Sequence, residues 1–278
     1  MLIDAVLPNV IGGRSSLTNL LKDEANRRGK SEEYVKDIIS VIPEALVAAG
    51  CFFDRLTGYW RYEFGEYTTL NALQNVLWGT HMWCRVDVLF LVLTCASERL
   101  TLEDRARYLQ RLANPSKHQD ALAEMYPVLR VASSVPVFFE VVGRADGNRT
   151  IDWLIEPPSG RPVLIEVKRR MADVIEAMDR VDLVKPPRHD PALLFRSLES
   201  KFLPAHTRNV LQGAWIVTDV KQSEKELKRA FNNLDPDKVH FYVLGDTRRD
   251  VYIFTRSDND KTYIKNTFNI IDSRRFTY

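Results

Sequence analysis

Residues 150–170, TIDWLIEPPSGRPVLIEVKRR, constrain the fold of this chain more than any other segment. Residues 150–156 and 163–168 both have the apolar, alternating pattern of β-strands, and the Pro-Pro-Ser-Gly sequence at 157–160 is a strong turn signal. The second strand begins with residues that are apolar on both faces, which is typical of a strand in the centre of a sheet. The segment therefore predicts a hairpin inside a larger sheet.

The side-chain alternation of this hairpin favours one register. Placing Asp152 opposite Glu166 is consistent with the rest of both strands, because it also pairs Leu154 with Leu164 and Trp153 with Ile165. Two carboxylates opposite each other on adjacent strands destabilise a sheet by up to about 1 kcal/mol, and by more when they are desolvated. We therefore expect a cation between them.

Composition argues against a disordered, a disulfide-bonded secreted or a membrane-spanning protein. A chain of 278 residues with 45% hydrophobic content is long enough to bury a large core, and a net charge of +2 over the whole chain does not by itself indicate a nucleic-acid-binding protein. The three cysteines form no CxxC pair, which favours a reduced, intracellular protein without structural disulfides. The first residues lack the pattern of a signal peptide, and the longest uncharged apolar run, residues 88–97, is too short to span a bilayer. We expect a cytoplasmic protein with no membrane partner.

The order of the expected elements predicts an α/β fold with a mixed central sheet flanked by helices. Residues 1–115 are expected to form a mostly helical region, with helical spacing over 17–49, 71–97 and 101–110, and with either a hairpin or an irregular loop at 51–67. Residues 116–278 are expected to form a second domain. Its helices are predicted at 119–131, 171–184, 192–202 and 223–234, and its strands at 135–142, 150–156, 163–168, 214–220, 239–244 and 251–255.

The two carboxylates and the lysine of the hairpin are suited to phosphodiester hydrolysis. Asp152 and Glu166 offer hard oxygen ligands of the kind that bind Mg²⁺, and the carbonyl of Val167 is an additional candidate ligand. Lys168 follows Glu166 by two residues and so shares its face, where its ammonium can reach an attacking water or a phosphate. Hydrolysis needs such positive charge to meet the charge that develops on the phosphate oxygens.

A third carboxylate has two candidates. Glu124 lies on the helix that precedes the first strand of the second domain, and Glu140 lies on the strand before the hairpin. Position on the helix favours Glu124 as a further catalytic residue. Helix glutamates are more often solvated surface residues, so both alternatives stay open.

Residues 124–220 resemble the PD-(D/E)XK nuclease superfamily, the restriction-endonuclease-like fold. Its core of helix, three strands, helix and strand carries an aspartate on the second strand and a Glu/Asp-X-Lys motif on the third, which match Asp152 and Glu166-Val167-Lys168. An acidic residue on the first helix of the family matches Glu124. The usual proline before the aspartate is replaced by Ile151, and Gln212 is the nearest analogue of a glutamine motif found in some members.

The resemblance implies a PD-(D/E)XK nuclease-like domain over residues 116–278 that cleaves DNA, or less often RNA, with Mg²⁺, for which Mn²⁺ is expected to substitute. Residues 1–115 would then recognise substrate or mediate oligomerisation, for instance as a homodimer. The basic residues after the hairpin are candidates to contact nucleic acid, although each is also an ordinary surface charge: Arg169, Arg170, Lys185 and Arg188, with Arg196 and Lys201 further on. The alternative is a catalytically inactive nuclease-fold protein that binds nucleic acid or a protein partner.

A metal titration tests the predicted pair of carboxylates. A ligand that binds only the folded state stabilises it by about 2.7 kcal/mol at a hundred times its Kd, so Mg²⁺ or Mn²⁺ should raise the thermal unfolding midpoint. We expect Asp152→Ala to remove this gain. A metal-dependent rise of equal size in the variant would contradict the site.

Overall fold

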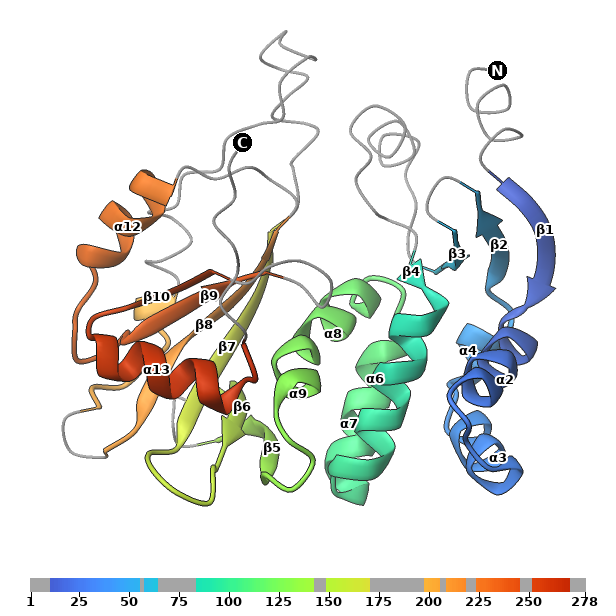
Figure 1. Ribbon diagram of the computed structural model, residues 1–278, viewed down its shortest axis with the longest axis horizontal. Helices are drawn as coiled ribbons and strands as arrows, with labels where there is room; N and C mark the ends of the chain where they lie inside the picture. Colours follow the sequence, from blue (N-terminus) through green and yellow to red (C-terminus); the bar gives the residue numbers. More distant parts are fainter. Residues whose placement is uncertain are drawn as a thin grey trace, which may run out of the picture. The chain divides into compact units, whose positions relative to one another are not determined.

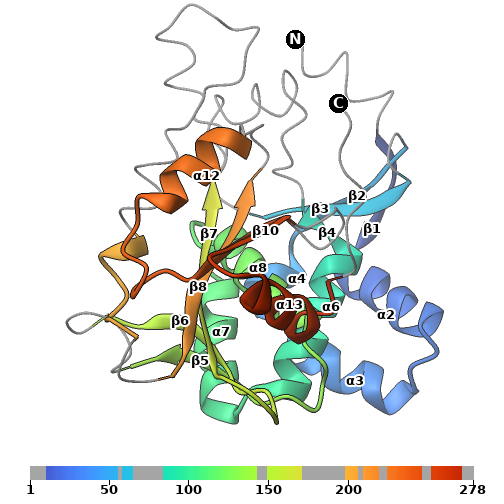
Figure 2. The ribbon, with the colours of Figure 1, turned by 60° about the vertical axis from the view of Figure 1, so that its left-hand side comes forward.

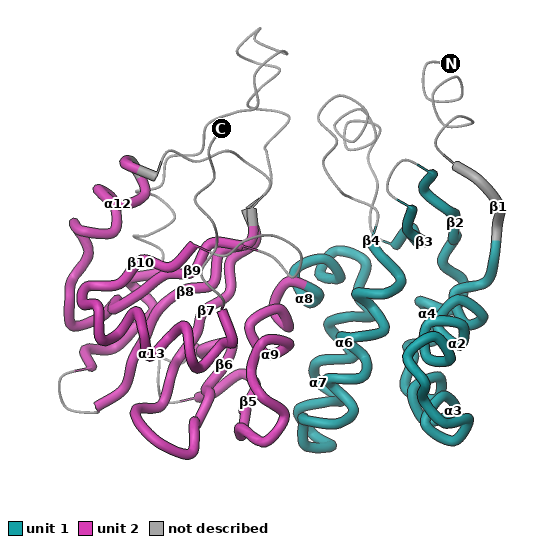
Figure 3. The backbone as a smooth tube through the Cα atoms, in the orientation of Figure 1, with its two compact units in different colours: residues 1–122 teal, residues 123–278 magenta. Residues whose placement is uncertain are grey.

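A computed structural model describes residues 11–55, 58–64, 84–142, 149–170, 198–205, 209–218, 224–245 and 252–270. The chain forms two compact units, unit 1 over Met1–Leu122 and unit 2 over Ala123–Tyr278 (Figure 3). The boundary that we placed after residue 115 therefore lies on the N-terminal side of this division. The predicted helix at 171–184 lies outside the described residues.

Unit 1 contains a four-stranded antiparallel sheet in the order β1-β2-β3-β4. Its strands are β1 (Ile11–Ser16), β2 (Gly50–Asp54), β3 (Tyr59–Glu63) and β4 (Cys84–Arg85). Strands β2 and β3 pair as a hairpin, which decides between the two alternatives for residues 51–67. The sequence analysis did not predict β1, because its residues IGGRSS lack apolar alternation and its pairing with β2 contains a register shift.

The helices of unit 1 follow the predicted apolar spacing. Those that the structure describes include α2 (Leu17–Arg27), α3 (Glu32–Ser40), α4 (Glu44–Val47), α6 (Val86–Arg99) and α7 (Leu102–Leu112). Thr101 is the N-cap of α7, since its side chain accepts a hydrogen bond from Asp104 N at 3.1 Å. Residues 71–83 of the predicted helix at 71–97 lie outside the described part of the chain.

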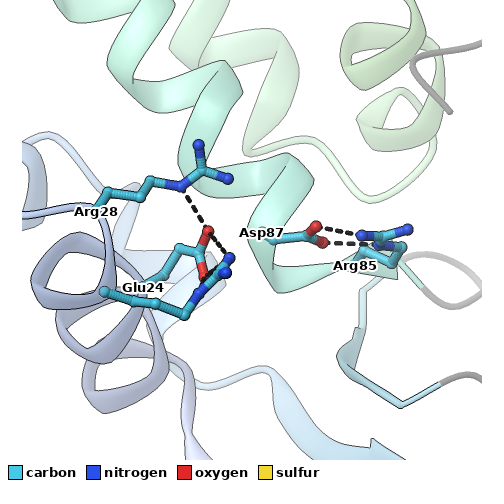
Figure 4. A network of polar contacts seen from close by, with 5 residues as sticks. Glu24, Arg28, Arg85 and Asp87 are labelled. Atoms are coloured by element: carbon cyan, nitrogen blue, oxygen red, sulfur yellow. Dashed lines mark hydrogen bonds and ion pairs between the residues drawn. The ribbon is translucent and has the colours of Figure 1, made fainter.

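Neighbouring arginines contact two carboxylates of unit 1, Glu24 on α2 and Asp87 at the start of α6 (Figure 4). Glu24 accepts hydrogen bonds from Arg27 Nε at 3.0 Å and from Arg28 Nε at 2.6 Å, both within one helical turn. Asp87 accepts from Arg85 Nε at 2.7 Å, and the Arg85 guanidinium lies 3.4 Å from the centre of the Tyr59 ring. These carboxylates are therefore engaged by neighbouring arginines.

Unit 2 contains a mixed six-stranded sheet in the order β10-β9-β8-β7-β6-β5 (Figure 1). Strands β5, β6 and β7 are joined in antiparallel fashion, β8 and β9 continue the sheet parallel to β7, and β10 is antiparallel to β9. Their bounds are Val137–Val141, Ile151–Ile155, Val163–Arg170, Leu211–Thr218, Phe241–Leu244 and Tyr252–Thr255 for β5 to β10 in turn. The sheet confirms the predicted α/β class, and its inner strand β7 confirms the central position expected for residues 163–168.

The predicted register of the hairpin is confirmed where the two strands pair. Trp153 lies opposite Ile165, and Leu154 lies opposite Leu164. The ladder between β6 and β7 ends at the pair of Trp153 and Ile165, one position before Asp152 would lie opposite Glu166. Both carboxylates therefore lie at the end of the ladder, while β7 continues alongside β8 as far as Arg170.

Helices cover the two faces of this sheet. Phe231 of α12 (Glu224–Asn232) stacks edge-on against Tyr242, which pairs with Ala214, so α12 covers the face of Ala214. The adjacent Trp215 points to the other face and contacts Phe268, the C-cap of α13 (Asp258–Thr267). Figure 2 shows α12 and α13 on different sides of β8.

Two further helices that the structure describes near the start of unit 2 are short. They are α8 (His118–Glu124), which crosses the boundary of the two units, and α9 (Tyr126–Arg130). The Arg130 guanidinium lies 6.0 Å from the centre of the Trp215 ring, so α9 contacts the same face as α13. Among the described residues, no helix combines the length and the apolar composition needed to cross a bilayer.

Close packing inside the sheet of unit 2 predicts that Gly213 cannot be replaced. A Cβ added there would lie 2.2 Å from the main-chain oxygen of Phe241, which belongs to the neighbouring strand and cannot rotate away. We expect Gly213→Ala to lower the free energy of unfolding by about 2 kcal/mol or more. Gly50→Ala is the matched control, because its Cβ would meet no atom within 4 Å, and it should change stability by less than about 0.5 kcal/mol. Equal denaturation midpoints of the two variants would contradict this packing.

Candidate active site

Two buried carboxylates meet where the ladder of β6 and β7 ends. Glu166 is 1% exposed and Asp152 is 7% exposed. Alternation along β7 places Glu166 on the same face as Leu164 and Lys168, which is the face that α12 covers. Ionised side chains are almost never this buried unless a partner compensates their charge.

Asp152 is anchored to the main chain of β7. Its Oδ2 accepts a hydrogen bond of 2.7 Å from the Val167 N–H. This interaction follows directly after the pair of Trp153 and Ile165, so the carboxylate takes the place of the next ladder partner. The main chain of Glu166 and Val167 is thereby fixed beside Asp152.

Glu166 has one oxygen fully engaged and one without a partner. Its Oε1 accepts hydrogen bonds from Lys168 Nζ at 2.6 Å and from Lys201 Nζ at 2.5 Å. Its Oε2 is buried and has no hydrogen-bond partner within the part of the chain that the structure describes. Buried carboxylate oxygens are normally satisfied, so this oxygen indicates a place for a cation or a donor.

Burial favours the neutral form of Asp152. Burial, and next the negative charge of Glu166, raise the pKa of the Asp152 carboxyl from its ordinary 3.8 to about 7. Lys201, the Val167 N–H and Lys168 act in the opposite direction. The two lysine ammoniums supply positive charge beside the pair, and both donate to Glu166, whereas a cation between the two carboxylates stays a prediction.

The donor set fits a magnesium ion. Asp152, Glu166 and the Val167 carbonyl would offer oxygen ligands, and Mg²⁺ is commonly held by one or two carboxylates while it keeps several waters. Within the described ranges, no group of three or more His, Cys, Asp or Glu side chains is arranged to hold a metal. The protein share of a coordination shell here would therefore come from two carboxylates and main chain.

The two candidates for a third carboxylate, Glu124 and Glu140, lie at different places in unit 2. The carbonyl of Glu124 accepts a hydrogen bond of 2.6 Å from Trp153 Nε1, and Trp153 points away from the face of Asp152. The main chain of Glu124 thus lies on the opposite face, and its catalytic role stays a prediction. Glu140 lies between the paired residues of β5, directly across from Asp152, with φ 49° in the left-handed region.

The basic candidates are only partly described. Arg169 and Arg170 end β7, opposite Val217 and Thr218 of β8. Lys185 and Arg188 lie outside the described residues, so their proposed contact with nucleic acid stays a prediction. Sequence reasoning considered Lys201 only as one of several contacts to a phosphate backbone, whereas the structure places its ammonium on Glu166.

A cavity of about 390 Å³ lies in unit 1. It is lined by Leu20, Asp23, Glu24, Arg27, Gly58, Tyr59, Trp60, Val86 and Asp87. Glu24 and Asp87 are already engaged by the arginines described above. The pair in unit 2 is the stronger candidate, because there a buried carboxylate oxygen lacks a partner within the described residues.

Comparison of the chain with protein-family models, with curated proteins and with solved structures gave no match. The resemblance to the PD-(D/E)XK superfamily therefore stays a prediction that rests on the residues and their geometry.

The buried pair predicts a pH-dependent stability in the presence of a chelator. Because the pKa of Asp152 is raised in the folded state, its contribution to stability is fully present below pH 3.8 and is lost as the pH rises through about 7. Asp152→Asn keeps an acceptor for the Val167 N–H and removes the buried charge. We expect this variant to be more stable than the wild type at pH 8, by about 2 kcal/mol.

The control for this measurement is Glu156→Gln, which removes a carboxylate at an exposed position just after β6. Chemical denaturation at pH 5 and pH 8 should show that only Asp152→Asn flattens the dependence on pH. A destabilised Asp152→Asn protein at pH 8 would contradict this account of the site.

Proposed function

We propose that unit 2 is a Mg²⁺-dependent nuclease of the PD-(D/E)XK type, with DNA as its expected substrate. The observation that carries this proposal is the buried Glu166 carboxylate, which shares one oxygen between two lysines and keeps the other without a hydrogen-bond partner in the described structure. Asp152 lies beside it with a raised pKa, which is typical of residues at functional sites.

The topology of unit 2 supports the same proposal. Helix α9 precedes three antiparallel strands, β5 to β7, and β8 then lies parallel to β7. This agrees with the order of helix, three strands, helix and strand that the family resemblance implies. The connection between β7 and β8 is described only at 198–205 and 209–210, so the helix of that segment remains a proposal.

Each residue of the site has a distinct role in the proposed reaction. Asp152, Glu166 and the Val167 carbonyl would hold Mg²⁺, which when bound supplies a Lewis acid that polarises the phosphate and the attacking water. Lys168 stabilises the negative charge that develops on the phosphate oxygens. Its hydrogen bond to Glu166 orients the ammonium within the site before substrate binds.

The stability cost of the site argues for catalysis over binding alone. Two carboxylates in a largely apolar sheet destabilise the folded state, and apolar or amide side chains of similar size would avoid this cost. Local features that lower stability are expected at functional sites. A nuclease-fold protein that only binds nucleic acid has no physical need for this arrangement.

Cleavage assays test the proposal directly. We expect degradation of plasmid or linear DNA with Mg²⁺ or Mn²⁺ and none with chelator, and parallel reactions with single-stranded DNA and RNA define the substrate. Lys168→Ala should lower the cleavage rate by at least about 100-fold with the fold intact, because one charge-stabilising donor is lost. Lys228→Ala, at an exposed position of α12, is the control and should retain activity. Wild-type cleavage by Lys168→Ala would contradict the mechanism.

A further inference from the structure

We propose that Lys201 is a second cationic residue of the active site, with two positions in the reaction cycle. Its ammonium compensates Glu166 while the metal is absent, and it turns to the phosphate of the substrate once the metal occupies that carboxylate. The inference rests on the proposed function and assigns a catalytic role to a residue outside the Glu166-Val167-Lys168 motif. Its first half concerns metal binding alone and can be tested without a substrate.

The contact between Lys201 and Glu166 is built into the fold. Lys201 lies between Leu198 and Phe202, and both of these side chains are 0% exposed in the core beneath α12. Lys201 N also donates a hydrogen bond of 3.0 Å to the Leu198 carbonyl, which closes a turn of the main chain. The main chain of Lys201 is therefore held in place by the buried side chains of Leu198 and Phe202.

Polar contacts fix the same segment to the loop that precedes β9. Asp235 N donates to the Glu199 carboxylate at 2.7 Å, and Ala205 N donates to the Asp237 carbonyl at 2.8 Å. Gln212, which is 0% exposed, donates through Nε2 to the Leu203 carbonyl at 2.6 Å. These bonds hold the main chain on both sides of Lys201, so its ammonium reaches Glu166 from a fixed starting point.

The charge balance of the site explains why two lysines are useful. When both carboxylates are ionised, as at pH 8, the two ammoniums cancel their charge and keep the buried site neutral overall while no metal is bound. A divalent cation adds two positive charges, and these match the phosphodiester charge and the further charge that develops as the phosphate is attacked. The lysines are then no longer required on Glu166 and are available to the substrate.

Both ammoniums can reach a substrate. The Lys201 side chain is 18% exposed and that of Lys168 is 31% exposed, whereas that of Glu166 is 1% exposed. The two lysines therefore approach the buried carboxylate from the solvent side. A phosphate at the mouth of the site would meet the lysines before it met Glu166.

The two positions of Lys201 predict that its substitution strengthens metal binding and slows cleavage. Removing the Lys201 ammonium removes a competitor of the metal for Glu166, so metal binding should tighten. The same change removes a cation from the phosphate, so cleavage should slow. A merely structural lysine would produce neither effect, because its loss would only lower the unfolding midpoint.

The test is Lys201→Met, studied by calorimetric titration with Mn²⁺ at pH 8 and by DNA cleavage at saturating Mn²⁺. We expect the Kd for Mn²⁺ to fall about tenfold, as for the loss of one unit charge at a partly screened position. We expect the cleavage rate to fall about 100-fold with little change in KM. Lys228→Met removes the same charge from an exposed position of α12 and should leave both quantities unchanged.

Lys201→Arg keeps the charge and should bind Mn²⁺ as the wild type does, which tests the proposal even if Lys201→Met does not fold. Unchanged or weaker Mn²⁺ binding by folded Lys201→Met, or tighter binding by Lys201→Arg, would overturn the compensating role. Tighter binding by Lys201→Met with full cleavage would overturn the catalytic role.

Failure of the proposed function gives a different result. In that case the wild type binds Mn²⁺ without cleaving any nucleic acid, and the catalytic half of this inference is overturned with it. The titrations of Lys201→Met and Lys201→Arg still decide whether Lys201 competes with the metal for Glu166.

Discussion

The hydrogen bond from the Val167 N–H to the Asp152 carboxylate is the interaction on which the site of unit 2 depends. It ends the pairing of β6 and β7 with a side chain in place of a main-chain partner. Without it, the buried Asp152 carboxylate would lose the main-chain donor that orients it toward the Glu-Val-Lys motif. Because the donor belongs to the residue between Glu166 and Lys168, one bond positions Asp152 against the whole Glu-Val-Lys motif.

Two lysines compensate the charge of the second carboxylate of the site, Glu166. Glu166 lies deep in the sheet, and Lys168 and Lys201 meet at one of its oxygens from two different segments of the chain. The arrangement keeps the site compact and nearly neutral while its second oxygen lacks a partner within the described structure. Unit 1 contains a buried pair of another kind, Arg61 Nε and Asp54 Oδ2 at 2.7 Å, in which the opposite charges compensate each other.

The sequence was sufficient to predict the hairpin, its register and the pair of carboxylates, because alternation and turn chemistry act over a few residues. Lys201 was not recognised as a residue of this site, since it lies 35 residues from Glu166 and their contact depends on how Leu198 and Phe202 pack. Strand β1 was missed for a similar reason: its residues carry no apolar pattern, and only pairing with β2 makes them extended. Glu124 could not be placed from sequence either, because the face that a helix covers is decided by tertiary contacts such as that with Trp153.

The left-handed conformation of Glu140 bears on how the protein can associate. Strand β5 is at the border of the sheet of unit 2, where its outer main-chain groups form a template for an incoming strand from another molecule. Glu140, the last residue but one of this short strand, has φ 49° and breaks the regular spacing of those groups, and its carboxylate adds charge at the same point. The kink therefore disfavours the addition of a foreign strand at this border, which protects the protein from edge-to-edge aggregation.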